Sequence, residues 1–228
     1  MGNDVADYDN NGALDVLVLD MVSEDNYGIK TSMPSMNPEL FDGRLSQGFH
    51  YQYMYNTLQR NTTFKDNNDT PRFTDAGRLA GITNTGWSWA PLMADFDNDG
   101  WKDIFITNGI KRDFRNNDFN LYLKKLIATD PAYLDNPAQM VEVINKIPKK
   151  PLKNYFYQNK GDLTFEKVTD SWCSELPTSL SNGAAYADLD NDGDLELIIN
   201  NMDEKASIYQ NNSTNNFVKL KFKGDDQN

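Results

Sequence analysis

The sequence predicts an all-β fold built from about three repeats, with helical insertions between some of the strands. Three gapless copies of a nine-residue acidic loop carry this prediction; they occupy residues 7–15, 95–103 and 188–196. An Ala precedes each copy and a short apolar run follows it. A second element recurs and ends each time in Asn; it occupies residues 56–61, 154–159 and 206–211. Short apolar or aromatic runs bounded by Gly, Asn and Asp are typical of β-strands.

The spacing of these elements indicates β-propeller blades interrupted by insertions. From the ninth loop residue to the recurring Asn there are 15 residues in the third repeat, 46 in the first and 56 in the second. Without this excess the repeats are slightly longer than the ~40–50 residues typical of four-stranded blades. We therefore expect a partial propeller over 1–214. Its repeat units lie near 1–86, 87–179 and 180–214, with insertions at about 21–55 and 108–153.

The middle repeat allows its strands to be placed individually. Short β-branched or aromatic runs predict them over residues 89–94, 104–107, 155–158 and 164–168. Its insertion has a different periodicity, with apolar residues at helical spacing over 118–127 and 137–146. Pro137 falls in the first turn of the second helix, and Pro148 ends it. The first insertion is rich in Met, Pro and alternating Tyr, and its sequence predicts no element.

The repeated loop has the composition of a calcium site. Positions 1, 3 and 5 are Asp or Asn, position 6 is Gly, and position 9 is Asp or Glu. Calcium takes about six to eight oxygen ligands, and Gly lets the chain turn sharply between them. Position 7 varies, which suits a backbone carbonyl ligand. The sequence predicts up to three calcium ions, held by Asp7, Asp9, Asn11, Ala13, Asp15, Asp95, Asp97, Asp99, Trp101, Asp103, Asp188, Asp190, Asp192, Asp194 and Glu196.

Two other interpretations of the loops remain open. Asp-Asn-Asp-Gly also forms ordinary metal-free turns, and magnesium also binds carboxylates, although it prefers stricter octahedral geometry. An EF-hand does not fit, because its position 12 must be Glu, whereas this sequence has Val18, Ile106 and Ile199 there. The loops therefore join strands rather than helices.

Charge and composition exclude several classes of function. The chain has a net charge of -12, and the carboxylates at loop positions 1, 3, 5 and 9 account for nearly all of it. Nucleic-acid binding needs a basic patch instead. A single Cys excludes an internal disulfide, and a single His excludes a multi-His zinc site. No apolar run reaches the ~18 residues of a membrane span.

The position of the first loop suggests that the chain is part of a longer protein. Asp7 follows Met1 so closely that we expect no room for a preceding strand. Three blades are also too few to close a propeller ring. Further blades or another chain would then be needed at the open edges.

These residues resemble FG-GAP/VCBS repeats, the calcium-loop blades of integrin α-subunit propellers. The stretches 87–109 and 181–195 are similar to bacterial relatives of cartilage acidic protein. Residues 215–228 resemble the start of an ASPIC/UnbV domain, with its first strand over 215–224. One departure is Cys173, which follows Trp172 where the family tends to have Gly. The resemblance implies a secreted or cell-envelope propeller that binds other molecules.

Three hypotheses of function follow. The first is a non-enzymatic module for protein or glycan binding and adhesion, whose partner contacts the face bearing the insertions. That face should lie opposite the calcium loops, because both insertions connect the second and third strands of a repeat. The second hypothesis is a carbohydrate-active enzyme, or an enzyme-associated subunit, with activity in the insertions; its carboxylates would be Asp113, Asp118, Asp130 or Glu142. The third is a purely structural segment.

Overall fold

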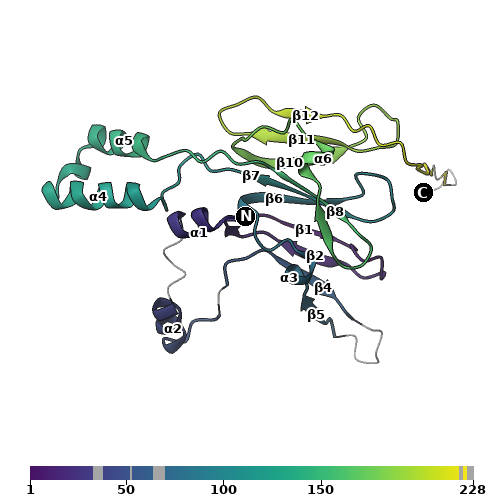
Figure 1. Cartoon of the computed structure of the whole chain (residues 1–228), viewed down its shortest axis with the longest axis horizontal. Helices are drawn as coiled ribbons and strands as arrows, with labels where there is room; N and C mark the ends of the chain where they lie inside the picture. The colour runs from purple at the N-terminus through teal and green to yellow at the C-terminus, as the bar shows by residue number, and fades with distance from the viewer. Residues whose placement is uncertain (33–37, 52, 64–69, 221–222, 225–228) are drawn as a thin grey trace.

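Three antiparallel β-sheets lie side by side and form the body of the protein (Figure 1). The computed structural model describes residues 1–32, 38–51, 53–63, 70–220 and 223–224. Within these ranges the mostly β fold is confirmed. Apart from β3, strands that follow one another in the chain are neighbours in their sheets, even where a long insertion separates them.

The first sheet has the order β1-β2-β4-β5. It consists of β1 (Asn3–Ala6), β2 (Asp15–Val18), β4 (Thr57–Asn61) and β5 (Phe73–Asp75). The expectation that no strand precedes the first loop is wrong. Asn3 to Ala6 are enough for four paired positions with Val18 to Asp15, because an antiparallel partner lies directly across the loop.

The second sheet has the order β3-β6-β7-β8-β9. It consists of β3 (Met21–Val22), β6 (Gly86–Ala94), β7 (Asp103–Asn108), β8 (Tyr155–Asn159) and β9 (Phe165–Lys167). The strands predicted from the middle repeat are thus confirmed to within a few residues. The two-residue β3 comes from the expected first insertion, yet it pairs with Gly86 and Trp87 of β6, in the sheet of the second repeat.

The third sheet has the order β10-β11-β12. It consists of β10 (Ser181–Ala187), β11 (Glu196–Asn201) and β12 (Ser207–Tyr209). Residues 215–220, for which the resemblance implies a strand, form none in the described chain. This segment turns back toward the loops, where the Phe217 ring lies against Gly193.

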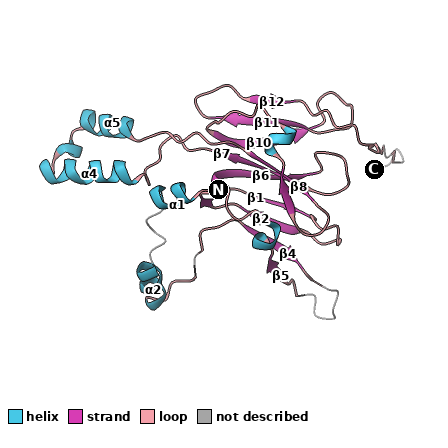
Figure 2. Cartoon of the chain, viewed as in Figure 1, coloured by secondary structure: helices cyan, strands magenta, loops and turns pink. Residues whose placement is uncertain are grey.

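Helices gather at one end of the sheets, on the left in Figures 1 and 2. The first insertion contributes α1 (Asn26–Ser32) and α2 (Pro38–Ser46). The second contributes α4 (Asn117–Thr129), a 3-10 turn η1 (Tyr133–Asp135) and α5 (Pro137–Lys146). Asn116 and Asn136 cap α4 and α5 by accepting from Phe119 and Ala138 N–H. Both helices predicted in the second insertion are confirmed.

Two short helices connect successive sheets. They are α3 (Gly77–Ala80), between β5 and β6, and α6 (Thr169–Trp172), between β9 and β10. Among the described residues no helix is both long enough and apolar enough to cross a membrane.

Apolar side chains fill the two spaces between adjacent sheets. One core contains Leu17 and Leu58 of the first sheet with Ile104 and Ile106 of the second. The other contains Phe105 and Phe156 of the second sheet with Leu197 and Ile199 of the third. Burial of this kind contributes about 25 cal/mol per Å² of apolar surface, so face-to-face packing of the sheets holds the body together.

Some repeat positions are buried between two sheets but exposed on the outer face of the first or the third sheet. Val18 corresponds in its repeat to Ile106 and Ile199; it is 40% exposed, whereas they are at most 1% exposed. Ile208 corresponds to Leu58 and Phe156 and is 65% exposed. Both ends of the array therefore present apolar surface to solvent.

Candidate metal centres

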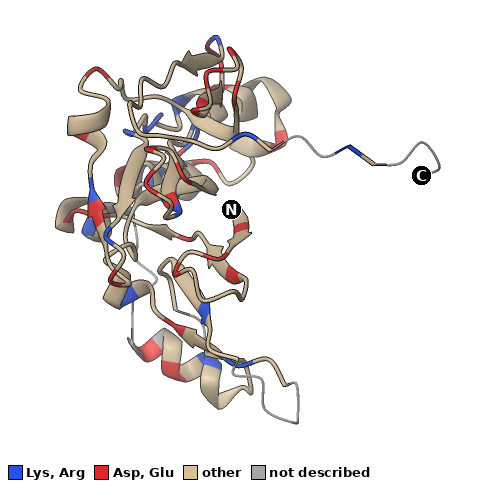
Figure 3. Cartoon of the chain, turned by 90° about the vertical axis from the view of Figure 1, so that its right-hand side faces the viewer, with Lys and Arg blue, Asp and Glu red and all other residues tan. Residues whose placement is uncertain are grey.

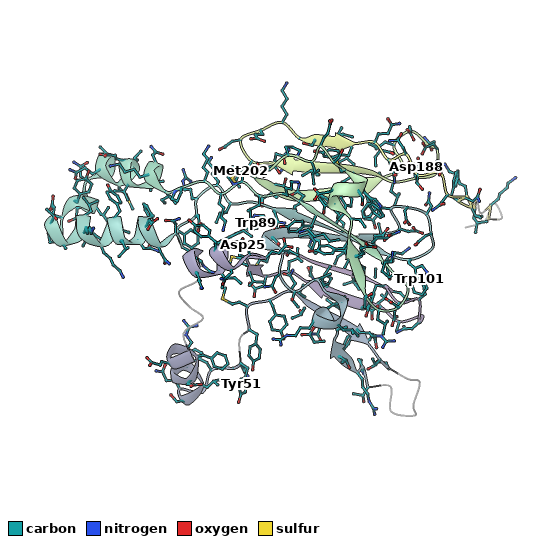
Figure 4. All side chains as sticks on the ribbon, viewed as in Figure 1. Asp25, Tyr51, Trp89, Trp101, Asp188 and Met202 are labelled. Atoms are coloured by element: carbon teal, nitrogen blue, oxygen red, sulfur yellow. The ribbon has the colours of Figure 1, made fainter. Side chains whose placement is uncertain are left out.

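The three acidic loops lie together at the end of the sheets opposite the insertions. They connect β1 to β2, β6 to β7 and β10 to β11. Trp101 and Asp188 mark this end in Figure 4, and Asp25 and Tyr51 mark the other. Figure 3 looks onto the loop end, where acidic residues recur along the loops.

The same backbone turn recurs in all three loops. The Asn at position 4 has a positive φ, of 54° in Asn10, 58° in Asn98 and 65° in Asn191. The Gly at position 6 has a φ of 86°, 94° and 96°. Asn and Gly adopt this left-handed region most readily. Two such residues in each loop curl it so that the acidic side chains face a common centre.

In the first two loops the carboxylate at position 1 accepts from the backbone of the turn. Asp7 accepts from the N–H of Asn11 at 3.0 Å and of Gly12 at 2.8 Å. Asp95 accepts from Asp99 at 3.0 Å and Gly100 at 2.9 Å. In the third loop Asp188 Oδ1 is buried without a hydrogen-bond partner.

The carboxylate at position 9 ties each loop to the end of the third strand of its repeat. Asp103 accepts from Phe96 N at 3.1 Å and Asn159 N at 2.9 Å. Asp15 makes the same pair of bonds with Tyr8 and Asn61, and Glu196 makes it with Leu189 and Asn211. This buried residue therefore fixes the loop against the neighbouring strand.

The carboxylate at position 3 accepts from the side chain that precedes the recurring Asn. Gln158 Nε2 donates to Asp97 at 2.7 Å, and Gln210 Nε2 donates to Asp190 at 3.2 Å. In the first repeat that residue is Arg60, which forms an ion pair with Asp9. The first loop thus contains a cationic side chain where the other two have a neutral amide.

The structure brings together most of the predicted carboxylates. Each of three groups has carboxylate oxygens within 4.8 Å of one another; they are Asp7–Asp9–Asp15, Asp95–Asp97–Asp99 and Asp190–Asp192–Asp194–Glu196. Such groups are close enough to hold a metal ion. Asp103 and Asp188 lie in the same loops but outside these groups. Asp194, predicted as a backbone ligand, brings its carboxylate into the third group.

Several buried carboxylate oxygens in the loops have no hydrogen-bond partner. In the described chain they are Asp9 Oδ1, Asp188 Oδ1 and Asp194 Oδ1. The Asp9 side chain is 3% exposed and Asp194 is 4% exposed. Leaving a buried charged acceptor unpaired costs several kcal/mol. A cation at the loop centre would satisfy these atoms, so the residues present fit a metal ion.

Burial raises the pKa of several loop carboxyls. The pKa of Asp103 rises to about 7, chiefly because the group is desolvated and also because Asp97 repels its charge. Desolvation also raises the pKa of Asp194 to about 6, with the charge of Asp192 adding to the effect. The pKa values of Asp15 and Asp99 are raised for the same first reason. Burial and the neighbouring carboxylates thus disfavour the ionised form of these groups.

Side-chain amides connect each loop to the next. Asn10 Nδ2 donates to Gly100 O at 3.1 Å, and Asn98 Nδ2 donates to Gly193 O at 3.2 Å. In the other direction, Asn159 donates to Tyr8 O at 2.8 Å. The sequence analysis did not foresee these links. The Asn shared by position 4 of all three loops was the available signal.

A second polar network lies at the insertion end of the sheets. Asn56 accepts from Asp20 N and donates to Thr85 Oγ1, while Asn154 accepts from Asn108 N and donates to Ser181 Oγ. Each Asn thus joins one repeat to the strand that opens the next. Both are at most 2% exposed. The third repeat has Ala206 at this position.

The four carboxylates considered for an enzyme form no common cluster, and two of them accept hydrogen bonds from nearby residues of the same insertion. Glu142 accepts from Lys146 at 2.8 Å, which lowers the pKa of Glu142. Asp130 accepts from Ala132 N at 3.1 Å, and Asp118 is exposed in the first turn of α4. Asp113 is buried with Oδ1 unpartnered. No group of three or more metal-ligating side chains occurs in the described part of the insertions.

Two comparisons of the chain with known proteins identify no related protein. A scan against protein-family models finds no match. A search of the curated proteins finds no matching protein either.

Proposed function

We propose that this chain is a calcium-binding module of the β-propeller type, which binds a protein or glycan partner and lacks enzymatic activity. One observation carries the calcium proposal. Buried carboxylate oxygens without a partner recur in acidic loops of one repeated design. These oxygens lie in the first and third loops, and the second loop gathers the same kind of acidic cluster. Unpaired buried charge is costly, so the loops are better explained as cation sites than as ordinary turns.

The ligands would be short oxygen-bearing side chains and one backbone carbonyl in each loop. In the second loop, Asp95, Asp97, Asp99 and Asp103 would supply carboxylates and Trp101 its carbonyl. The corresponding residues of the other loops would do the same. Calcium, when bound, supplies positive charge that offsets the repulsion among these groups. Asp103 and its equivalents would then hold each loop against the third strand of its repeat.

The succession of sheets supports the propeller part of the proposal. Apart from the two-residue β3, the four strands of the first repeat pair in chain order, and so do the four strands of the second repeat. Adjacent sheets bury matching apolar faces, and Val18 and Ile208 expose such faces at the two ends. Further blades or another chain would cover these faces in the complete assembly.

The insertion end supports a binding role. Exposed apolar and aromatic side chains gather on its helices and loops, including Tyr27, Tyr51, Leu121 and Val141. Large exposed apolar groups of this kind are typical of surfaces that contact partners. We place the protein or glycan partner on this face. A secreted or cell-envelope location follows from the same proposal, because millimolar calcium is available outside the cell and suits weak sites.

Terbium luminescence tests the calcium proposal. Terbium takes oxygen ligands like calcium, and Trp101 at position 7 of the second loop would transfer excitation energy to an ion bound there. We expect luminescence that calcium reverses and that Trp101→Phe reduces. Asp97→Asn should weaken binding at the same loop. The proposal is wrong if calcium fails to displace terbium, or if neither substitution changes the signal.

Replacement of the second insertion tests the binding role. Asp113 N donates to Pro148 O at 2.8 Å, so a short Gly-Ser linker can join these residues without moving β7 or β8. We expect the shortened chain to keep its calcium sites and to lose binding on glycan and extracellular-protein arrays. Unchanged array binding would contradict the placement of the partner on this face.

A further inference from the structure

The residue before the recurring Asn differs in charge among the three repeats. Arg60, Gln158 and Gln210 occupy this position. All three side chains donate to the carboxylate at loop position 3. The contact is therefore conserved in geometry across the repeats, but only in the first repeat does the donor carry a positive charge.

The Arg60–Asp9 pair lies where water screens charge poorly. The Asp9 side chain is 3% exposed and the Arg60 side chain 32%. Partly buried ion pairs interact more strongly than exposed ones and are less sensitive to salt. The pKa of Arg60 is raised by its hydrogen bond to Asp9, so the guanidinium stays charged at any pH of interest.

The first loop also has the fewest carboxylates. It has Asp7, Asp9 and Asp15, with neutral Asn11 at position 5. The second loop has a carboxylate at each of positions 1, 3, 5 and 9, and the third adds Asp194 at position 7. With Arg60 included, the negative charge facing a cation is lowest in the first loop. The charge of the ligands is a main determinant of calcium affinity.

We propose that Arg60 is an internal cation that sets the calcium affinity of the first loop, so that calcium fills the second and third loops first. The inference rests on the proposed calcium function and adds an order of occupancy to it. Arg60 neutralises one carboxylate of the first loop and repels an incoming divalent cation. Asp9 Oδ1, which Arg60 does not contact, remains available to an ion.

The same contact gives Arg60 a role in the calcium-free protein. It compensates the buried charge of Asp9, which would otherwise face Asp7 and Asp15 without a partner. In the second and third loops a Gln amide donates a hydrogen bond but supplies no charge. We therefore expect the first repeat to be the least dependent on calcium for its fold.

Calcium titration of Arg60→Gln tests the inference, because this change installs the residue that the other two repeats have. Arg78→Gln is the matched control, since Arg78 lies over the Tyr55 ring and belongs to the same repeat. Isothermal titration of chelator-stripped protein would give stoichiometry and affinity. We expect two tighter sites and one weaker site in the wild type and in Arg78→Gln. In Arg60→Gln the weaker site should tighten at least tenfold.

A second change assigns the gained affinity to the first loop. Adding Asp9→Asn to Arg60→Gln should remove the gain and leave the other two sites unchanged. If Arg60→Gln folds only in calcium, ions per chain can be counted after dialysis against low calcium; we expect three for the variant and two for the wild type. Three equal wild-type sites, or an unchanged Arg60→Gln, would overturn the inference but leave the calcium function standing. No calcium uptake by any of these proteins would overturn both.

Discussion

The two ends of the sheets are held together by different kinds of polar contact, although the same strands connect them. At the loop end, charged side chains repeat in register, and each position 9 carboxylate holds two backbone N–H groups. At the insertion end, neutral Asn56 and Asn154 link successive repeats, and two dissimilar helical segments extend from this end of the sheets. On the proposed calcium function, we expect calcium to stabilise the loop end of the sheets and to have little effect on the insertion end.

Asp103→Ala should give the largest effect and should depend on calcium. The change leaves the N–H groups of Phe96 and Asn159 unpaired in a fully buried site. We expect a loss of about 3 kcal/mol in the free energy of unfolding in calcium, since each unpaired buried group costs ~1–3 kcal/mol. Urea unfolding with calcium and after chelation measures it. Exposed Glu204→Ala is the control. Equal losses in both conditions would contradict a calcium role for this loop.

Asn154→Ala should give a smaller effect that calcium does not change. It removes the acceptor of Asn108 N and the donor to Ser181 Oγ from a buried network. We expect a loss of about 2 kcal/mol with or without calcium. The same urea experiment serves as the measurement. A loss confined to calcium-free protein would show that the two ends are coupled and would remove the contrast between them.

The pH dependence of the calcium effect should follow the loop carboxyls. Burial raises the pKa of Asp103 to about 7, well above its unfolded value. Without calcium this group favours folding at low pH, and that contribution is lost as pH rises through about 7. Calcium needs the ionised form, so the rise in melting temperature that it causes should be larger at pH 7.5 than at pH 5.5. Scans of metal-free and calcium-loaded protein at both values measure the difference. A larger rise at pH 5.5 would contradict this ionisation.

Val141→Asp on α5 should give the smallest effect on stability. Val141 is 55% exposed at the insertion end. We expect a change within about 0.5 kcal/mol, as for most exposed positions. Partner binding on the arrays described above should fall, however, because a charge enters the proposed binding surface. A large loss of stability would indicate instead that the helices are an integral part of the core.

Sequence was sufficient where a pattern repeats or has a clear period. The three loops align without gaps, and their Asp, Asn and Gly residues indicate both turn and ligand chemistry. The helical spacing of Phe119, Tyr122 and Leu126 located α4, and Pro137 marked the start of α5. In each case the local sequence fixes the local backbone, and the spacing fixes the face that is buried.

Other features depend on contacts that local sequence does not encode. The two residues of β3 are too few to show a period, and they pair with a strand more than sixty residues away. The ion pair of Arg60 with Asp9 requires the fold to bring the first acidic loop beside β4, about fifty residues further along the chain. Residues 215–220 illustrate the same limit, since an apolar alternating pattern alone does not supply a strand with a partner.

Melting of chelator-stripped protein with increasing calcium tests the central claim most directly. The account predicts a saturable rise in melting temperature, accompanied by heat of binding, with magnesium much less effective at the same concentration. Ligand linkage gives about 2.7 kcal/mol per site at a hundredfold excess over the dissociation constant. If calcium produces neither heat nor any rise in melting temperature, the loops are metal-free turns and the account is wrong.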